Sequence, residues 1–185
     1  MYHHVHIFGA PGSGVSTLGK TLADRLGYSF FDTDDYYWFT GDDLPYRRKR
    51  NPEHRLRLLR SDLAEAPQFV LSGALFGWGD PVMREQIDLI VYRWLPAALR
   101  LERIRKREAA RYGRERLLPG GDLHVVFEKF LNWSAGYDQE DTMLQRTRSA
   151  DLRALEEASV CPVLHLEQDQ TVEALVTCIF EFMHT

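Results

Sequence analysis

The residues with the clearest chemical meaning form a glycine-rich segment, residues 9–17, between an apolar run and a helical pattern. The segment reads, in order, Gly9, Ala10, Pro11, Gly12, Ser13, Gly14, Val15, Ser16 and Thr17. It matches the phosphate-loop pattern G-x-x-x-x-G-K-[ST] at both glycines and at Ser16. In that pattern the glycines let backbone N–H groups turn toward phosphate oxygens, and the following helix adds its positive N-terminal end. We therefore predict that residues 9–17 bind the phosphates of a nucleotide and that the Ser16 hydroxyl binds Mg²⁺.

The lysine of this pattern is absent, because Val15 occupies its position. The missing ammonium normally bridges two phosphates and neutralises charge as the phosphoryl group is transferred. Losing one such contact slows a reaction by roughly 100- to 1000-fold. Lys20, farther along the helix, is turned about 140° away, so we expect it at the surface. Either another cation, best an arginine of the basic helix described below, reaches the phosphates, or transfer is slow, or the segment only binds nucleotide.

Two carboxylates, Asp32 and Asp34, follow the second apolar strand pattern, at the sheet edge where ligands of parallel α/β proteins bind. An extended chain would direct both side chains to the same side. One carboxylate would then hold the magnesium shell, and the other would orient a substrate hydroxyl or accept its proton. The alternative is a turn with a helix cap, for which Asp35 is the expected residue. The aromatic run at residues 36–39 fits a substrate-binding wall and core packing equally well.

A stripe of arginines follows the fourth strand pattern. Its members are 4, 4 and 3 residues apart and are predicted to share one helix face: Arg103, Arg107, Arg111 and Arg114. Arginine pairs with phosphate through two parallel hydrogen bonds, and glycines at 113, 120 and 121 provide hinges. We therefore predict a lid that closes over the phosphates and excludes water, with Arg107 and Arg111 as the first candidates for contact. The alternative is an exposed helix in which Glu102 and Glu108 neutralise these charges.

Two further features are candidates for binding the acceptor of a phosphoryl group. A basic patch follows the aspartates and suits an anionic acceptor; it comprises Arg47, Arg48 and Arg50. The third strand ends in Ser72 and Gly73 without the terminal aspartate of a Walker B strand, and a glycine there lets a backbone N–H approach an acceptor atom.

Alternating apolar runs and helical patterns position these residues. The strands are predicted over residues 5–8, 28–31, 69–71, 87–94 and 160–166, and the main helices over 15–26, 51–64, 96–112, 125–133, 147–158 and 172–182. Another helix is expected to start at residues 80–81. This alternation predicts an α/β fold, with a parallel sheet covered on both faces. Nothing in the sequence marks a second domain, so residues 1–185 are expected to form one.

Composition narrows the functional classes. The chain has 23 basic and 27 acidic residues, a formal net charge of −4, which argues against a nucleic-acid-binding surface. Apolar stretches are too short for a membrane span, and the first residues lack the features of a signal peptide. Two cysteines without a CxxC pair fit a reducing cytoplasm and exclude a disulfide scaffold. We expect a cytoplasmic protein whose partner is a small molecule rather than a nucleic acid or a membrane.

In this order, the loop at residues 9–17, the Asp-x-Asp element, the Ser-Gly strand end, the arginine-rich segment and the final strand and helix resemble the small P-loop kinases of the adenylate, shikimate and gluconate kinase group. The resemblance spans nearly the whole chain. It implies a five-stranded parallel sheet ordered 2-3-1-4-5, a P-loop NTPase fold, a lid within about residues 100–145, Mg-ATP as the donor and a small-molecule acceptor. By similarity, Asp34 matches the carboxylate that holds the acceptor hydroxyl, and Asp32 the one near magnesium. Arg107 and Arg111 match the region of the lid arginines.

The leading hypothesis is an ATP-dependent phosphotransferase acting on a small metabolite. Asp34, Arg107 and Arg111 would act in catalysis, while Asp34, Arg47 and Gly73 would bind the acceptor. Ser16 and Asp32 would hold Mg²⁺. Two alternatives stay open: a nucleotide-binding regulatory or accessory module with little transfer activity, and a nucleoside monophosphate kinase. The sequence leaves the acceptor and the oligomeric state undetermined.

Overall fold

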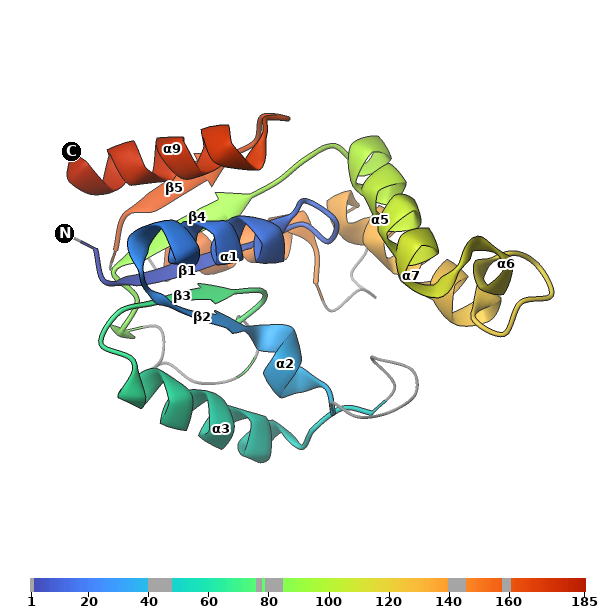
Figure 1. Ribbon diagram of the computed structural model, residues 1–185, viewed down its shortest axis with the longest axis horizontal. Coiled ribbons are helices and arrows are strands. Elements are labelled where there is room, and N and C mark those ends of the chain that lie inside the picture. The colour runs from blue at the N-terminus through green and yellow to red at the C-terminus, as the bar shows by residue number, and fades with distance from the viewer. Residues whose placement is uncertain (1, 40–47, 76–77, 79–84, 140–145, 158–160) are drawn as a thin grey trace.

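The computed structural model describes residues 2–39, 48–75, 78, 85–139, 146–157 and 161–185. Strands and helices alternate along the chain (Figure 1). In chain order they are β1 (His4–Gly9), α1 (Val15–Leu26), β2 (Ser29–Asp32), α2 (Thr33–Tyr37), α3 (Pro52–Glu65), β3 (Phe69–Ser72), β4 (Leu89–Arg93), α5 (Ala97–Tyr112), α6 (Arg114–Leu117), α7 (His124–Ala135), the short 3₁₀ turn η1 (Gly136–Asp138), α8 (Arg148–Glu157), β5 (Val163–Leu166) and α9 (Val172–His184). The helix start expected at residues 80–81 lies outside the described residues.

The five strands form one parallel sheet in the order β2-β3-β1-β4-β5. β1 lies in the middle, where Val5 is paired with Val70 of β3 and with Leu89 of β4. The residues of β3 and β4, and all but His4 of β1, are buried because both faces of the sheet are covered. The predicted α/β fold with a 2-3-1-4-5 sheet flanked by helices is therefore confirmed.

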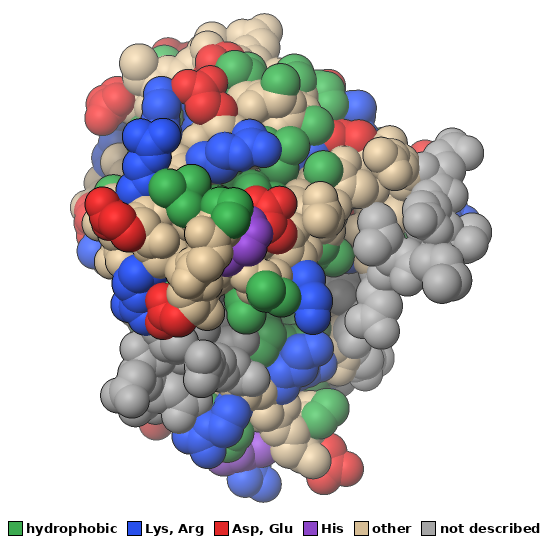
Figure 2. Space-filling model, turned by 90° about the vertical axis from the view of Figure 1, so that its right-hand side faces the viewer, with side chains coloured by type: hydrophobic (Ala, Val, Ile, Leu, Met, Phe, Trp, Pro, Cys, Tyr) green, Lys and Arg blue, Asp and Glu red, His purple; other side chains and the backbone are tan. Residues whose placement is uncertain are grey.

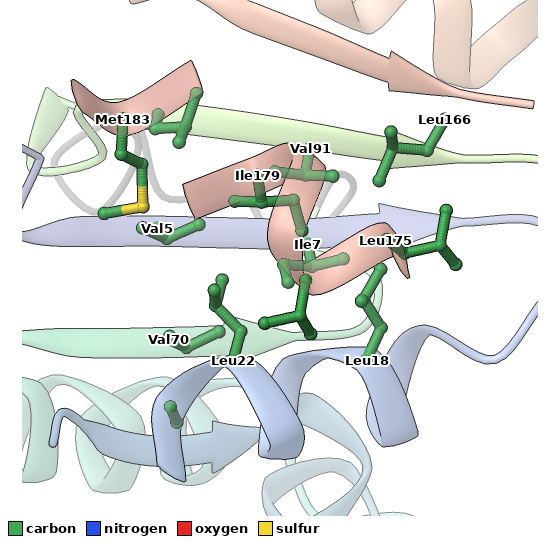
Figure 3. Close-up of a cluster of buried hydrophobic side chains, with 13 residues drawn as sticks. Val5, Ile7, Leu18, Leu22, Val70, Val91, Leu166, Leu175, Ile179 and Met183 are labelled. Atoms are coloured by element: carbon green, nitrogen blue, oxygen red, sulfur yellow. The ribbon is translucent and has the colours of Figure 1, made fainter. Parts of the chain in front are cut away.

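Two hydrophobic cores hold the helices against the sheet. On one face, Leu18 and Leu22 of α1 and Ile179 of α9 pack against Val5 and Val91 (Figure 3). The opposite core contains side chains from the other face of the same strands and from α3 and α8: Phe8, Leu71, Ile90, Tyr92, Leu59, Leu63 and Leu155. Because both cores meet the central strands, the carboxyl ends of β1, β3 and β4 are held in fixed positions, and the loops that follow these strands start from a rigid base.

Two predicted helix boundaries have clear local causes. α1 ends at Gly27, whose φ of 70° is the left-handed conformation that glycine adopts without steric cost. α3 begins after Asn51, whose side chain accepts hydrogen bonds from the N–H groups of Glu53 and His54 at 2.9 and 3.4 Å. Pro52 occupies the first helical position, where no N–H is needed.

The basic segment differs from its prediction. α5 ends at Tyr112, and Gly113, with a φ of 86°, separates it from α6, which begins at Arg114. Arg114 therefore does not continue the α5 stripe, and the predicted single face of four arginines is wrong at its last member. A glycine in a left-handed conformation ends a helix more strongly than charge spacing extends it. The helices α5, α6 and α7 project beyond the sheet at the end where its strands finish (Figure 1). Within the described ranges, no helix combines the length and the apolar character that crossing a membrane requires.

Candidate active site

The glycine-rich loop lies directly after β1 and is supported by β4 and α5. Gly9 has a φ of 153°, and a Cβ there would lie 1.8 Å from the carbonyl oxygen of Arg93. Gly12, with a φ of 82°, would place a Cβ 2.8 Å from the carbonyl oxygen of Arg100 and 2.9 Å from Ile104. Both positions therefore require glycine because the backbone of the loop touches neighbouring elements.

Ser13 stabilises the loop from inside. Its hydroxyl donates to the carbonyl oxygens of Ala10 at 2.7 Å and of Arg93 at 3.2 Å, and the side chain is buried. The Ala10 N–H also donates to the Arg93 carbonyl, at 3.0 Å. These bonds hold the loop in a closed turn, so the Ser13 side chain supports its shape rather than facing a ligand.

The N-terminus of α1 is suited to bind an anion. Gly14 precedes the helix with a φ of 92°, and no side chain caps the first turn. Ser16 and Thr17 are exposed. The first N–H groups of a helix have no partner within the helix and carry partial positive charge. Backbone donors and an accessible hydroxyl fit the polyphosphate and the Mg²⁺ ion of a nucleotide.

Val15 contributes packing in place of a charge. Its half-buried side chain lies against the hydrophobic core formed by α1, α9 and the sheet. Lys20 is exposed, as predicted for a surface lysine. The loop therefore has the glycine-shaped backbone that the phosphate-loop pattern predicts, but no ammonium at position 15.

Asp32 and Asp34 do not continue a strand together. Asp32 ends β2, and its carboxylate caps α2 by accepting a hydrogen bond from the Asp34 N–H at 3.0 Å. The extended arrangement predicted for these residues is wrong, and so is Asp35 as the cap. A side-chain oxygen at the N-cap satisfies the N–H two residues later, which favours starting the helix at Thr33 over extending the strand. The two carboxylates nevertheless remain close enough to affect each other's charge.

The electrostatic surroundings of Asp34 favour a proton acceptor near neutral pH. Its carboxylate is accessible to solvent on one side and surrounded by protein on the others. The desolvation, followed by the negative charge of Asp32, raises the pKa of Asp34 to about 6. The positive charge of Arg146 and a hydrogen bond from the Trp38 side chain partly oppose this rise. A carboxylate with such a pKa is ionised at pH 7 and can still take up a proton during a reaction.

Gly73 lies beside Asp32 but offers different chemistry from that predicted. A Cβ at Gly73, where φ is 98°, would lie 2.1 Å from the Thr33 hydroxyl and 3.5 Å from an Asp32 carboxylate oxygen. The Gly73 N–H donates to the Ile7 carbonyl at 2.9 Å, and its carbonyl accepts from Nε2 of His6 at 2.8 Å. The sequence predicted that the Gly73 N–H contacts an acceptor atom. This prediction is wrong, because the N–H already donates to the Ile7 carbonyl within the sheet.

Arg55 of α3 is a site candidate that the sequence analysis missed. Its guanidinium lies 4.5 and 4.6 Å from the ring centroids of Tyr37 and Trp78, which are themselves 6.2 Å apart. Arg55 is 9% exposed, and its Nε has no hydrogen-bond partner among the residues described. The aromatic residues at 36–39, a candidate wall of the substrate site, are the sequence signal that could have pointed to a cation packed nearby. A buried guanidinium that packs against two aromatic rings is a strong candidate for holding an anionic group.

The basic patch predicted near the aspartates is only partly described. Arg47 lies outside the described residues. Arg48 and Arg50 both lie over the ring of Phe39, with guanidinium-to-centroid distances of 4.9 Å. A role for Arg47, or for its two neighbours, in binding the acceptor stays a prediction.

The predicted lid arginines lie along α5, away from the loop. Arg107 donates to the Glu108 carboxylate at 2.7 Å and lies 6.0 Å from the ring of Phe130, and Arg111 lies 5.8 Å from the ring of Tyr112. These contacts lie within helices α5 and α7. Basic side chains are spread over the face on which α5, α6 and α7 project (Figure 2). Contact of Arg107 and Arg111 with phosphates remains a prediction that requires the lid to close.

Three other arginines contact the loop or lie next to it. Arg100 donates to the Pro11 carbonyl at 3.0 Å. Arg103 has a terminal nitrogen 3.9 Å from the position that a Cβ on Gly14 would occupy. Arg146 donates to the Gly9 carbonyl at 2.7 Å. Among the residues that the structure describes, no group of three or more His, Cys, Asp and Glu side chains could hold a metal ion by itself. A Mg²⁺ ion at Ser16 and Asp32 would therefore need additional ligands from phosphate or water.

No family model matches the chain, but several proteins do. It is 39% identical over 183 residues to YqaC of Bacillus subtilis (strain 168), an uncharacterized protein, with 99% of this chain and 98% of YqaC covered. It is 31% identical over 173 residues to a shikimate kinase of Gloeobacter violaceus, with 89% of this chain and 95% of the relative covered. A cytidylate kinase of Ignicoccus hospitalis is 32% identical over 117 residues, which are 58% of this chain and 66% of that kinase.

Solved structures show the same fold. A shikimate kinase from Acinetobacter baumannii in complex with shikimate has a TM-score of 0.53 at 17% identity and covers 99% of this chain and 93% of its own. A shikimate kinase from Bacteroides thetaiotaomicron has a TM-score of 0.52 at 15% identity, with full coverage of both chains. The sequence relatives and the sheet order lead to one conclusion: the chain belongs to the group of small P-loop kinases that includes the shikimate, cytidylate and gluconate kinases.

Proposed function

We propose that the chain transfers the γ-phosphoryl group of Mg-ATP to a hydroxyl group of a small anionic metabolite. The observation that carries this proposal is that the Arg146 guanidinium donates to the Gly9 carbonyl of the loop, while its charge acts on the Asp34 carboxylate. The glycine-rich loop and a carboxylate with a raised pKa thus share the influence of one arginine. This is the arrangement that transfer between a nucleotide and a hydroxyl requires.

Each residue would have a separate task. The N–H groups of residues 9–17 would bind the phosphates, and Ser16 and Asp32 would contribute to the magnesium shell. Mg²⁺ would neutralise phosphate charge. A carboxylate oxygen of Asp34 would accept the proton of the acceptor hydroxyl. The hydroxyl oxygen would then bond to the γ-phosphorus, while the bond between that phosphorus and the leaving oxygen of ADP breaks. Residues 1–185 would act as one domain, with a lid in about residues 100–145 bringing Arg107 and Arg111 to the phosphates.

The anionic character of the acceptor rests on Arg55. A guanidinium that is nearly buried and retains an unpartnered N–H is costly unless a ligand completes its hydrogen bonds. The aromatic rings of Tyr37 and Trp78 keep it in one orientation. A carboxylate or phosphate group of the acceptor would pair with the positive charge of this guanidinium. Binding of the acceptor by Arg47 stays a prediction, whereas the Gly73 N–H is already used within the sheet.

Calorimetry with Mg-ATP and single-turnover transfer from labelled ATP test this function. The acceptor panel should contain hydroxy-carboxylates, sugar acids and nucleoside monophosphates, because the last of these identify a nucleoside monophosphate kinase. Arg55→Met is expected to raise the KM for the acceptor at least tenfold and to leave the Kd for Mg-ATP unchanged, whereas Arg57→Met, an exposed neighbour on α3, changes neither. Absence of Mg-ATP binding by the wild-type protein would refute the proposal.

Val15 favours a second candidate, a nucleotide-binding regulatory module with little transfer activity. Its packing against the core leaves the loop without an ammonium. In that case the wild-type protein binds Mg-ATP but transfers nothing to the panel in a single turnover, and Val15→Lys restores transfer. Rapid transfer by the wild-type protein would exclude this module.

A further inference from the structure

The phosphates of a nucleotide in this loop would lack the positive charge that a lysine at position 15 provides. The described residues contain three guanidinium groups in contact with the loop or next to it, those of Arg100, Arg103 and Arg146. Their partners differ, and the differences decide which of them can replace the ammonium.

Arg100 is occupied by the protein itself. Its side chain is fully buried and donates to the carbonyl oxygens of Leu95, Pro11 and Ser134 at 2.8, 3.0 and 3.1 Å. It also pairs with Asp138. With its nitrogens used in this way, Arg100 supports the loop from behind and has little capacity to bind a ligand.

Arg103 lies at the opposite end of the loop from Gly9. It is next to Gly14 and forms an ion pair with Asp169 at 2.6 Å, in which both side chains are largely exposed. Its charge acts on Arg93, whose pKa is lowered first by burial and then by Arg103. Nothing connects Arg103 to Asp34 in the described structure, so it is placed for the part of the nucleotide far from the acceptor.

Arg146 is the guanidinium on the acceptor side. It donates to the Gly9 carbonyl at 2.7 Å, at the carboxyl end of β1. The same strand accepts the Gly73 N–H at Ile7, and Gly73 lies beside the Asp32 carboxylate that starts the Asp32–Asp34 segment, so this end of the loop is the one next to the aspartates. Arg146 therefore lies beside the path of the phosphoryl group, although it is far from the loop and from the basic helix in the sequence.

A buried network fixes the position of Arg146. Its guanidinium pairs with Asp151 at 3.3 Å, and Asp151 accepts a hydrogen bond from the Tyr137 hydroxyl at 2.6 Å. The Tyr137 hydroxyl is in turn 2.9 Å from that of Tyr92 on β4. Asp151 and Tyr137 are 4% and 1% exposed, so this chain of bonds is protected from water. A cation held in this way loses little conformational entropy when it contacts a phosphate.

We propose that Arg146 supplies, at the γ-phosphate, the positive charge that Val15 does not, and that Asp151 and Tyr137 act as its positioning residues. This inference rests on the proposed function because it assumes that residues 9–17 bind Mg-ATP. It assigns the replacement to a residue two positions before α8 and not to the basic helix α5. It also identifies Arg146 as the contact that distinguishes a triphosphate from a diphosphate.

The test compares the affinities for Mg-ATP and Mg-ADP by calorimetry, so that it does not depend on transfer or on knowing the acceptor. The wild-type protein is expected to bind Mg-ATP more tightly than Mg-ADP, and Arg146→Gln should reduce the preference by about 10- to 100-fold, the range for losing a hydrogen bond to a charged group. Arg153→Gln, an exposed arginine of α8, should keep the wild-type preference. Arg146→Lys should retain part of it.

Restoring the lysine provides the decisive comparison. Val15→Lys should recover the Mg-ATP preference in the Arg146→Gln background and add much less in the wild-type background. Tyr137→Phe should lower the preference for Mg-ATP over Mg-ADP in the wild-type background and have no further effect in the Arg146→Gln background. A general loss of stability would not produce this difference between the two backgrounds. Circular dichroism and the Tm show whether each variant folds.

Three results would overturn the inference: a wild-type protein that binds both nucleotides equally, an Arg146→Gln variant with the full preference, or equal gains from Val15→Lys in both backgrounds. If the wild-type protein binds neither nucleotide, the proposed function fails as well. If it binds both and only the Arg146 comparison fails, the proposed function stands and this inference does not.

Discussion

Replacing Asp34 with asparagine is expected to stabilise the metal-free protein at neutral pH and to abolish transfer. The desolvation of the carboxylate and the charge of Asp32 make the ionised form of Asp34 less favourable in the folded protein than in the unfolded chain. Asparagine has a similar shape and carries no charge. A residue that orients and deprotonates a substrate would therefore be retained at a cost in stability.

The size and sign of the effect follow from the pKa. A rise from 3.8 to about 6 corresponds to about 3 kcal/mol at 1.4 kcal/mol per unit. Because Asp34 is accessible to solvent, screening reduces the expected difference to about 1 kcal/mol. Between these two pKa values the folded protein binds more protons than the unfolded chain, so the wild-type protein loses stability as the pH rises. The advantage of Asp34→Asn should grow from zero near pH 4 to its full value near pH 7.

Urea unfolding of both proteins in EDTA at several pH values between 5 and 8 measures this difference. Asp24→Asn, which removes an exposed carboxylate of α1, is the matched control and should show no such pH dependence. The reasoning is refuted if the stability gain of Asp34→Asn is independent of pH, or if the variant is less stable than the wild type at pH 8.

Three further substitutions test how the site is supported, each by urea unfolding. Gly19→Ala should destabilise the protein by about 1–3 kcal/mol, since its Cβ would lie 2.0 Å from the Ser72 hydroxyl; a stabilising effect, from better helix propensity, would contradict this packing. Asp138→Ala should cost about 3 kcal/mol because it leaves the buried Arg100 without its carboxylate, and a neutral effect would show that the carbonyl partners suffice. Asn51→Ala should cost about 1 kcal/mol through loss of the α3 cap, and an unchanged midpoint would rule out that contribution.

The sequence predicts the layers of this fold well because each layer has a local signal. Continuous apolar runs identify strands that are buried on both faces, as in β3 and β4. Leu18 and Leu22 identify the buried side of α1, and Gly27 its end. The loop at residues 9–17 combines a strand, glycines and a helix start in one short segment, so it can be recognised without tertiary information.

The site was harder to predict because its side chains come from distant parts of the chain. Arg146 and Gly9 are 137 residues apart, and their contact exists only once α8 packs on the sheet. The contact of Arg55 with two aromatic rings requires Trp78, which lies more than 20 residues farther along the chain. The N-cap role of Asp32 was missed for a different reason: three aspartates in four residues offer several local choices, and sequence spacing does not choose among them.

The short turn η1 has a mechanical consequence. Two consecutive residues of this turn are linked to the first part of the glycine-rich loop: Tyr137 through Asp151 and Arg146 to Gly9, and Asp138 through Arg100 to Pro11. Since η1 directly follows α7, a rotation of that helix displaces both Tyr137 and Asp138. The first part of the loop and the projecting helices are therefore coupled, and a nucleotide that changes the loop would also shift these helices.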